Sequence, residues 1–356
     1  MTKLKQVIKK IITTYEKYIN SPKRFGIDNS FPDEIIITYL SPLSDRKRHG
    51  ISGGVKIIYQ QSEEINNLLS PKFQSQVLHP DNINFICNWF EHSAKIKRNL
   101  NFNIKKEFLI IPEVWAEKYA PQCKLLGLKY GIFVQNGYLI ASTNNNTSTF
   151  FAYHNAEIIL TISDDTTDCC KLAFPAIASK IMRVHYFVDP NKFKPNQKKN
   201  NVITYMPRKI PKHSKLVIFF LEKHLPENWK IIPIINMTEN EVIKTIQMSK
   251  IFLSFSEFEG CQLPPIEAAL TGNKVIGYTG EGGKEYWKPP IFSEIMMGDI
   301  KCFVNEIISE IHKYDTNNGF IFDKNEIQKL ADLYSKERER NDILRLSEKI
   351  KKVLLS

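Results

Sequence analysis

Short apolar runs alternate with helical patterns along most of this chain. Many runs are continuous enough for strands buried on both faces, and segments with apolar residues at helical spacing lie between them. Strands are predicted over residues 34–40, 108–111, 131–134, 157–163, 202–206, 229–235, 251–255 and 274–278, and helices over 55–69, 113–126, 213–225, 239–249 and from Pro265 onward. Strands that alternate with helices predict a doubly wound α/β fold with parallel sheets.

A turn-rich segment, residues 189–201, interrupts this alternation. Its prolines, asparagines and lysines are typical of a linker. We therefore predict two Rossmann-like domains that face each other across a cleft, over residues 1–197 and 198–325. Residues 326–356 are a charged helical segment, for which packing back on the N-terminal domain is one expected arrangement.

Residues 1–20 have the pattern of a basic amphipathic helix, with an apolar stripe and several lysines mostly away from it. Two interpretations stay open. The helix could lie on an anionic membrane surface, or it could pack on the protein's own domain, which is the more common use of such a pattern.

Charge and composition narrow the expected partners. The chain has 356 residues, a formal net charge of +11 and six cysteines without metal-type spacing, which indicate reduced thiols. We expect nucleotide-type donors and acidic lipids as anionic partners rather than nucleic acid, because no zinc finger, helix-turn-helix pattern or aromatic RNA-recognition signature is present. No apolar run approaches the roughly 20 residues of a membrane span. The expected location is the cytoplasm, with peripheral contact at the inner face of the membrane left open.

One segment carries two carboxylates, Glu259 and Glu267, with seven residues between them. A strand-like run precedes it, Pro264 and the proline after it fit a helix start, and Gly272 fits the helix end. We therefore expect Glu259 in a strand-to-helix loop and Glu267 in the first turn of the helix. There the backbone amides and the helix dipole favour an anion. Such a site can hold a phosphorylated ligand while a carboxylate binds sugar hydroxyls.

At these residues the chain resembles the retaining GT-B glycosyltransferases of family 4, which carry a Glu, seven residues, Glu signature. The run Glu259-Gly-Cys-Gln-Leu-Pro-Pro-Ile-Glu267-Ala is similar to the family's Glu-Gly-Phe-Gly-Leu-Pro-x-x-Glu-Ala, with Cys261 and Gln262 in place of Phe-Gly. Further similar runs lie at residues 111–115, 133–138, 188–195 and 203–209. The resemblance implies the GT-B fold, a nucleotide-sugar donor bound mainly by the C-terminal domain, and an acceptor on the N-terminal domain.

The resemblance also implies roles for single residues. Glu259 would face the transferred sugar, while Arg208 and Lys209 would stabilise the leaving diphosphate, so these three are the expected catalytic residues. Glu267 would accept hydrogen bonds from ribose hydroxyls. The other expected donor-binding residues are Gly53, Gly54, Gly260, Cys261, Gln262, Leu263, Gly282, Gly283 and Glu285, and the candidates on the acceptor side are Asn136 and His154. No metal or other cofactor is expected, because no Asp-x-Asp motif stands at a strand end.

The resemblance thus implies a retaining, metal-independent transferase that moves a sugar to a glycan or lipid-linked acceptor, in bacterial-type surface polysaccharide synthesis. The main alternative is a catalytically inactive GT-B scaffold that binds nucleotide or glycan, which the Cys261-Gln262 replacement keeps open. An inverting transferase or a sugar-nucleotide epimerase would lack the carboxylate pair in this context. A nucleic-acid-binding protein ranks third.

Overall fold

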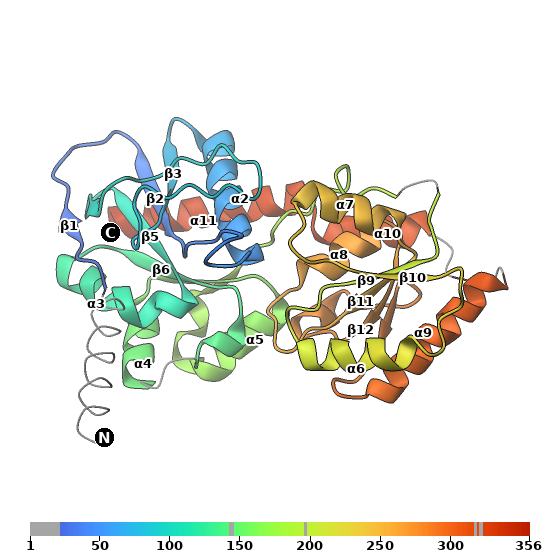
Figure 1. The fold of residues 1–356 in the computed structure, drawn as a ribbon. Helices are drawn as coiled ribbons and strands as arrows, with labels where there is room; N and C mark the ends of the chain where they lie inside the picture. Colours follow the sequence, from blue (N-terminus) through green and yellow to red (C-terminus); the bar gives the residue numbers. More distant parts are fainter. Residues whose placement is uncertain (1–21, 142–145, 196–197, 317–318, 320–322) are drawn as a thin grey trace, which may run out of the picture.

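The computed structural model describes residues 22–141, 146–195, 198–316, 319 and 323–356. The amphipathic helix expected over residues 1–20 lies outside the described residues. Two parallel sheets lie side by side, each flanked by helices (Figure 1). The doubly wound α/β class predicted from the sequence is therefore confirmed.

The N-terminal sheet has six strands in the order β3-β2-β5-β6-β7-β8, and all its neighbouring strands run parallel. Its strands are β2 (Ile35–Leu40), β3 (Phe73–Leu78), β5 (Glu107–Pro112), β6 (Tyr130–Val134), β7 (Ile158–Thr161) and β8 (Ile181–Arg183). Its helices are α2 (Gly53–Leu69), α3 (Ala116–Leu126), α4 (Asn146–Asn155) and α5 (Asp164–Ala173), with short 3₁₀ turns η1 (Glu113–Trp115), η2 (Gly137–Leu139) and η3 (Pro175–Lys180). Two further strands, β1 (Gly26–Ile27) and β4 (Asn101–Phe102), pair with each other.

The C-terminal sheet has five parallel strands in the order β10-β9-β11-β12-β13. They are β9 (Val202–Tyr205), β10 (Lys230–Pro233), β11 (Ile251–Ser254), β12 (Lys274–Gly277) and β13 (Phe292–Glu294). The helices are α6 (Pro211–Leu221), α7 (Glu239–Met248), α8 (Leu263–Leu270), α9 (Ile300–Asp315), α10 (Lys324–Leu333) and α11 (Lys336–Leu355), with the 3₁₀ turn η4 (Gly282–Glu285).

Strand β5 shows why the central strands have continuous apolar sequences. Phe108 and Ile110 point into the core on one face of the sheet, and Leu109 and Ile111 into the core on the other. All four are 1% exposed or less, because helices cover both faces of a parallel sheet. The first of these cores continues past Phe193 of the linker into the C-terminal domain, so the two sheets share a core on one side.

The last helix, α11, returns to the N-terminal domain and lies against α2 and β5. Glu64 of α2 accepts ion pairs from Lys336 at 2.6 Å and Arg340 at 2.7 Å. Asp342 bonds the side chain of His185 at 2.6 Å. The chain therefore crosses from the N-terminal to the C-terminal domain at the linker and returns in its last helix.

Candidate functional site

Helix α8 begins one residue before the prolines that the sequence indicated. Gln262 is its N-cap residue and Leu263 its first helical residue. Gly272, just beyond the C-terminal end, has a left-handed φ of 82°, as expected of a residue that ends a helix. The prediction that Glu267 lies in the first turn was wrong: the first turn contains no acidic residue. Because dipole effects fall off beyond the first turn, Glu267 gains little from the helix N-terminus.

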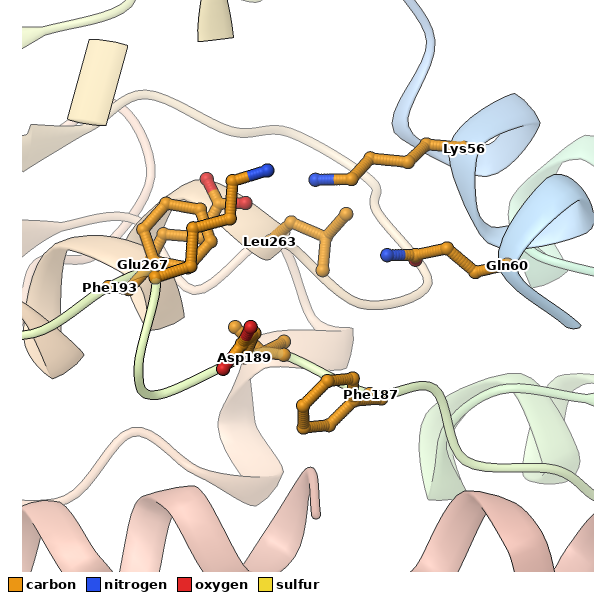
Figure 2. Close-up of a pocket in the computed structure, with 9 residues that line it drawn as sticks. Lys56, Gln60, Phe187, Asp189, Phe193, Leu263 and Glu267 are labelled. Atoms are coloured by element: carbon orange, nitrogen blue, oxygen red, sulfur yellow. The ribbon is translucent and has the colours of Figure 1, made fainter. Parts of the chain in front are cut away.

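Glu267 lines a cavity of about 150 Å³ between the two domains. Lys56 and Gln60 reach toward it from α2, opposite Leu263 and Glu267 of α8 (Figure 2). The Glu267 carboxylate makes no hydrogen bond or ion pair with the described residues. Burial raises its pKa, and this effect exceeds the opposing influence of Lys56. An unpartnered, half-buried carboxylate in a cavity is typical of a ligand site rather than of a structural contact. The rest of the lining comes from the linker and the two residues before it: Phe187, Val188, Asp189, Lys192 and Phe193.

A second glutamate beside this cavity is fully paired. Glu239, at the start of α7, accepts ion pairs at 2.6 Å from both Lys56 of α2 and Lys192 of the linker. Burial raises the Glu239 pKa, but the two ammonium groups outweigh burial and lower the pKa overall. The sequence analysis missed these three residues. For Lys56, the sequence offered one signal of a role at the site, its position shortly after the Gly53-Gly54 turn.

Glu259 and Lys209, two of the expected catalytic residues, lie in contact. Glu259 follows β11 and forms an ion pair with Lys209, which follows the neighbouring strand β9. The carboxyl ends of adjacent parallel strands meet at one edge of the sheet, where α/β proteins bind their ligands. Arg208 is exposed, and its guanidinium has no partner among the described residues. It is thus available to an anion.

Two glycines allow three loops to meet at this edge. A Cβ atom at Gly260 would overlap the backbone oxygen of Gln135 in the N-terminal domain, and one at Gly282 would overlap the backbone oxygen of Gly260. The N–H of Gly282 donates to the backbone carbonyl of Glu259 at 3.1 Å, and the N–H of Gly283 donates to the Thr279 carbonyl at 3.1 Å. The backbone N–H groups of Gly282 and Gly283 therefore form hydrogen bonds within the protein, and the expected contact of these glycines with a donor stays a prediction.

The side chains of Cys261 and Gln262 are also occupied by the protein. The Gln262 Oε1 accepts hydrogen bonds from Ser254 at 3.0 Å and Ser256 at 2.9 Å, and its amide donates to the Thr279 carbonyl. The Cys261 thiol lies 2.8 Å from the hydroxyl of Tyr186, and burial raises its pKa to about 12. Both replacements of the family's Phe-Gly thus support the loop from inside, and their predicted contact with a donor stays a prediction.

Glu285 forms a link between the domains rather than an open donor ligand. Its carboxylate accepts hydrogen bonds from Arg183 of β8 at 2.8 Å, from the backbone of Asp164 at 3.1 Å and from the Tyr334 hydroxyl at 2.8 Å. Arg183 also pairs with the Asp164 carboxylate at 2.6 Å. Sequence could not reveal these partners, because they come from strands and helices far apart in the chain.

The Gly53-Gly54 turn opens α2 directly opposite α8. A Cβ atom at Gly53 would lie 3.2 Å from the Leu263 side chain, and the carbonyl of Gly54 accepts a hydrogen bond from Gln135 at 3.0 Å. The first backbone N–H groups of a helix have no partner within the helix. The start of α2 is therefore positioned to bind an anion between the domains.

The two acceptor-side candidates have different positions. Asn136 bridges the domains, because its side-chain amide donates to the Phe258 carbonyl at 2.8 Å, next to Glu259. His154 lies at the exposed end of α4, where its Nδ1 bonds the Phe150 carbonyl of the same helix at 2.9 Å. Its contacts involve only residues of the N-terminal domain. The structure thus does not bring His154 together with the other site residues.

The buried carboxyl of Glu113 holds the turn that contains Asn136. Glu113 is 9% exposed, its carboxyl accepts a hydrogen bond from the backbone N–H of Asn136 at 3.1 Å, and burial raises its pKa to about 7. The sequence analysis did not single out Glu113, although it stands in the run that resembles the N-terminal domain of the family.

Glu113→Gln is expected to stabilise the protein at pH 8 but not at pH 4. The unfolded carboxyl ionises near its ordinary pKa of 4.5 and the folded one near 7, so wild-type stability falls between these values as pH rises. Glutamine keeps the acceptor oxygen and cannot ionise, so the variant should gain on the order of 3 kcal/mol above pH 7. Urea unfolding at the two pH values measures this. If the free energies of unfolding of Glu113→Gln and wild type differ by the same amount at pH 4 and pH 8, ionisation of Glu113 does not cause the difference.

No group of three or more His, Cys, Asp or Glu side chains in the described part of the chain could hold a metal ion. Likewise, none of the helices among the described residues is long and apolar enough to cross a membrane.

Comparisons with solved structures identify the fold. The crystal structure of HepE from Anabaena in complex with UDP-glucose matches over 88% of this chain and 100% of that chain, with a TM-score of 0.68 and 12% sequence identity. Sucrose-phosphate synthase from Thermosynechococcus elongatus covers 90% of this chain and is itself covered fully, with a TM-score of 0.65 and 10% identity. The catalytic domain of starch synthase IV from Arabidopsis thaliana, bound to ADP and acarbose, has a TM-score of 0.61 and 8% identity, with 91% of this chain and all of that chain covered. This chain therefore has the GT-B fold.

Sequence comparisons give a weaker link. No protein-family model matches the chain. An alpha-1,6-glucosyltransferase from Actinobacillus pleuropneumoniae serotype 7 (strain AP76) is 25% identical over 182 residues, which are 49% of this chain and 53% of that protein. The match thus spans about half the length of the curated relative.

Proposed function

We propose that this protein transfers a sugar from a nucleotide-sugar donor to a glycan or lipid-linked acceptor. One observation carries the proposal: the cleft-side edge of the C-terminal sheet holds a Glu259–Lys209 ion pair, beside an unpartnered Glu267 and an open Arg208. Cations for a diphosphate and carboxylates for sugar hydroxyls are the groups that such a donor needs. The GT-B fold and the similarity to an alpha-1,6-glucosyltransferase support the same activity.

In this proposal the donor lies between α2 and α8. Glu267 accepts hydrogen bonds from the ribose hydroxyls, while Arg208, Lys209 and the start of α2 at Gly53 bind the diphosphate. Glu259 faces the transferred sugar, and transfer proceeds with retention of configuration. The protein cations supply the charge stabilisation that a metal would otherwise supply.

The donor also requires the domains to move apart before it binds. The cavity of about 150 Å³ is smaller than the roughly 300–1,000 Å³ of typical small-molecule sites. Contacts that span the domains keep it small: the pair of Lys56 with Glu239, the pair of Arg183 with Glu285, and the bond from Asn136 to Phe258. Each is polar and partly exposed, so water can replace the partners when the domains separate.

We further place the reaction in the cytoplasm at the inner face of the membrane, in bacterial-type surface polysaccharide synthesis, with Asn136 and His154 on the acceptor side.

The second candidate function is an inactive GT-B scaffold that binds nucleotide or glycan. It is favoured by one observation, the internal use of Cys261 and Gln262 where the family has Phe-Gly. Nucleic acid is not among the proposed partners.

A panel of nucleotide sugars tests the function, with uridine diphosphate sugars first because HepE was solved with UDP-glucose. The matching donor should raise the melting temperature and be slowly hydrolysed. Arg208→Ala should lower turnover about tenfold or more, because a lost charge-assisted contact costs roughly 1.5–3 kcal/mol.

Arg338→Ala is the matched control, because Arg338 is an exposed arginine on α11 and should leave turnover unchanged. A donor that raises the melting temperature without hydrolysis or transfer would favour the inactive scaffold. Equal turnover of Arg208→Ala and wild type at saturating donor would remove Arg208 from the site.

A further inference from the structure

Helix α6 is apolar on two opposite sides. On the inner side, Val217 and Leu221 are fully buried in the core of the C-terminal domain. On the outer side, Phe219 is 58% exposed, Phe220 is 48% exposed and Leu216 is 38% exposed. A surface helix normally has one apolar stripe, and that stripe faces the core. The outer apolar side chains of α6 therefore add nothing to the folded core.

Lysines surround this outer apolar patch. Lys212 and Lys215 are exposed and lie seven and four residues before Phe219, so they share its face of the helix, while the exposed Lys223 follows just beyond the helix end. Helix α6 itself contains no aspartate or glutamate, and the nearest acidic residue is Glu222 at its C-cap. The outer face thus combines aromatic rings with uncompensated positive charge.

We propose that the outer face of α6 binds an anionic lipid surface. Exposed aromatic and leucine side chains enter the boundary between headgroups and acyl chains, while lysines on the same face contact anionic headgroups. Lysine stems suit this geometry, because they lie along apolar surface and keep the ammonium group in water.

Charge argues against the other natural occupant, a second copy of this chain. If α6 packed on α6 across a two-fold axis, Lys212 and Lys215 of both copies would lie in one interface, and the helix itself contains no carboxylate to pair with them. Like charges brought together in this way oppose association. An anionic bilayer instead offers a negatively charged headgroup to each lysine.

The position of α6 connects this surface to the candidate site. The helix begins two residues after Lys209, so docking through α6 places the Glu259–Lys209 pair close to the lipid surface. Figure 1 shows α4, α5 and α6 along one edge of the molecule, and α4 and α5 also carry exposed apolar side chains, at Phe150 and Leu172. The inference rests on the proposed function, because a lipid surface is useful to a transferase with a lipid-linked acceptor. Lipid binding itself can be measured without donor or acceptor.

The test is flotation of the full chain with vesicles of phosphatidylglycerol or of phosphatidylcholine. Wild type should float with the anionic vesicles only. The double variant Phe219→Ser/Phe220→Ser and the double variant Lys212→Glu/Lys215→Glu should each reduce the bound fraction about tenfold. The lysine pair is exposed on α6, so its replacement tests the proposal even if the phenylalanine variant folds poorly.

Two matched controls use the same substitutions elsewhere. Phe31 is 90% exposed and followed closely by Asp33 and Glu34, so Phe31→Ser should bind like wild type. Lys351 is exposed on α11, so Lys351→Glu should reduce the fraction bound to anionic vesicles far less than Lys212→Glu/Lys215→Glu does.

Three results would overturn the proposal: no flotation of wild type, undiminished flotation of the α6 variants, or a dimer in solution that Phe219→Ser dissociates. Undiminished flotation would assign membrane binding to another part of the chain, such as residues 1–21. Donor hydrolysis separates this inference from the proposed function. A chain that floats through α6 but hydrolyses no nucleotide sugar keeps the lipid surface and loses the transferase assignment.

Discussion

Glu259→Gln is expected to lower kcat about 100-fold, the scale of removing one preorganised electrostatic contact to a transition state. In the proposed function, positive charge develops on the sugar as its bond to the diphosphate breaks, and the Glu259 carboxylate stabilises that charge. Glutamine has nearly the same shape but no charge. Steady-state kinetics with saturating donor and acceptor measure the effect, and KM for the donor should change little.

Glu257→Gln is the control for this variant. Glu257 is exposed in the same loop, two residues before Glu259, and its replacement causes the same change in net charge. Folding should survive both substitutions, because the lysine that Glu259 pairs with is 45% exposed and such surface pairs contribute about 0–1 kcal/mol. Equal turnover in Glu259→Gln and Glu257→Gln would mean that Glu259 does not act in catalysis.

The strands that could be predicted are the ones buried on both faces. Runs such as 108–111 and 251–255 are continuously apolar, and they appear as β5 and β11. The edge strand β3 was missed, because its sequence Phe-Gln-Ser-Gln-Val-Leu contains three polar residues in a row, two of them half-buried glutamines at the sheet edge. Helix α4 was missed for a related reason: its sequence Asn-Thr-Ser-Thr-Phe-Phe-Ala-Tyr-His-Asn has almost no apolar stripe.

The candidate site divides in the same way into local and long-range parts. Glu259, Arg208 and Lys209 could be found because each stands just after a recognisable strand, and adjacent parallel strands end at one edge. Lys56, Glu239 and Arg183 could not, because their partners lie in the other domain or in the linker, and sequence spacing says nothing about how two domains face each other.

The resemblance to a family motif also says less about a residue's contacts than about its location. Gly260, Cys261 and Gln262 lie in the loop that leads to α8, and Glu285 lies in η4. Their partners, however, are neighbouring loops, tyrosines and the N-terminal domain. The motif thus shapes the loop that holds Glu259, which explains why a Phe-Gly to Cys-Gln change is compatible with the fold.

Glu267→Gln is expected to raise the donor KM about 30-fold with kcat nearly unchanged, because in the proposed function the carboxylate accepts two charge-assisted hydrogen bonds from a ribose that does not react. The same variant should be more stable than wild type without ligand at pH 8. Burial raises the Glu267 pKa, so its charge opposes folding once pH exceeds the folded pKa, and glutamine removes that charge. Kinetics with saturating acceptor and a thermal melt measure the two effects.

Glu239→Gln, beside the same cavity, is expected to change stability in the opposite direction. Its pKa is lowered overall by Lys56 and Lys192, so the Glu239 charge stabilises the fold above its unfolded pKa, and this stabilisation is lost as pH falls through the folded pKa. Glu239→Gln should therefore lower the melting temperature at pH 8, whereas Glu267→Gln should raise it. A site residue trades stability for ligand binding, and a structural one does not. If Glu267→Gln lowers the melting temperature and leaves KM unchanged, Glu267 is a structural carboxylate and the ribose must bind elsewhere.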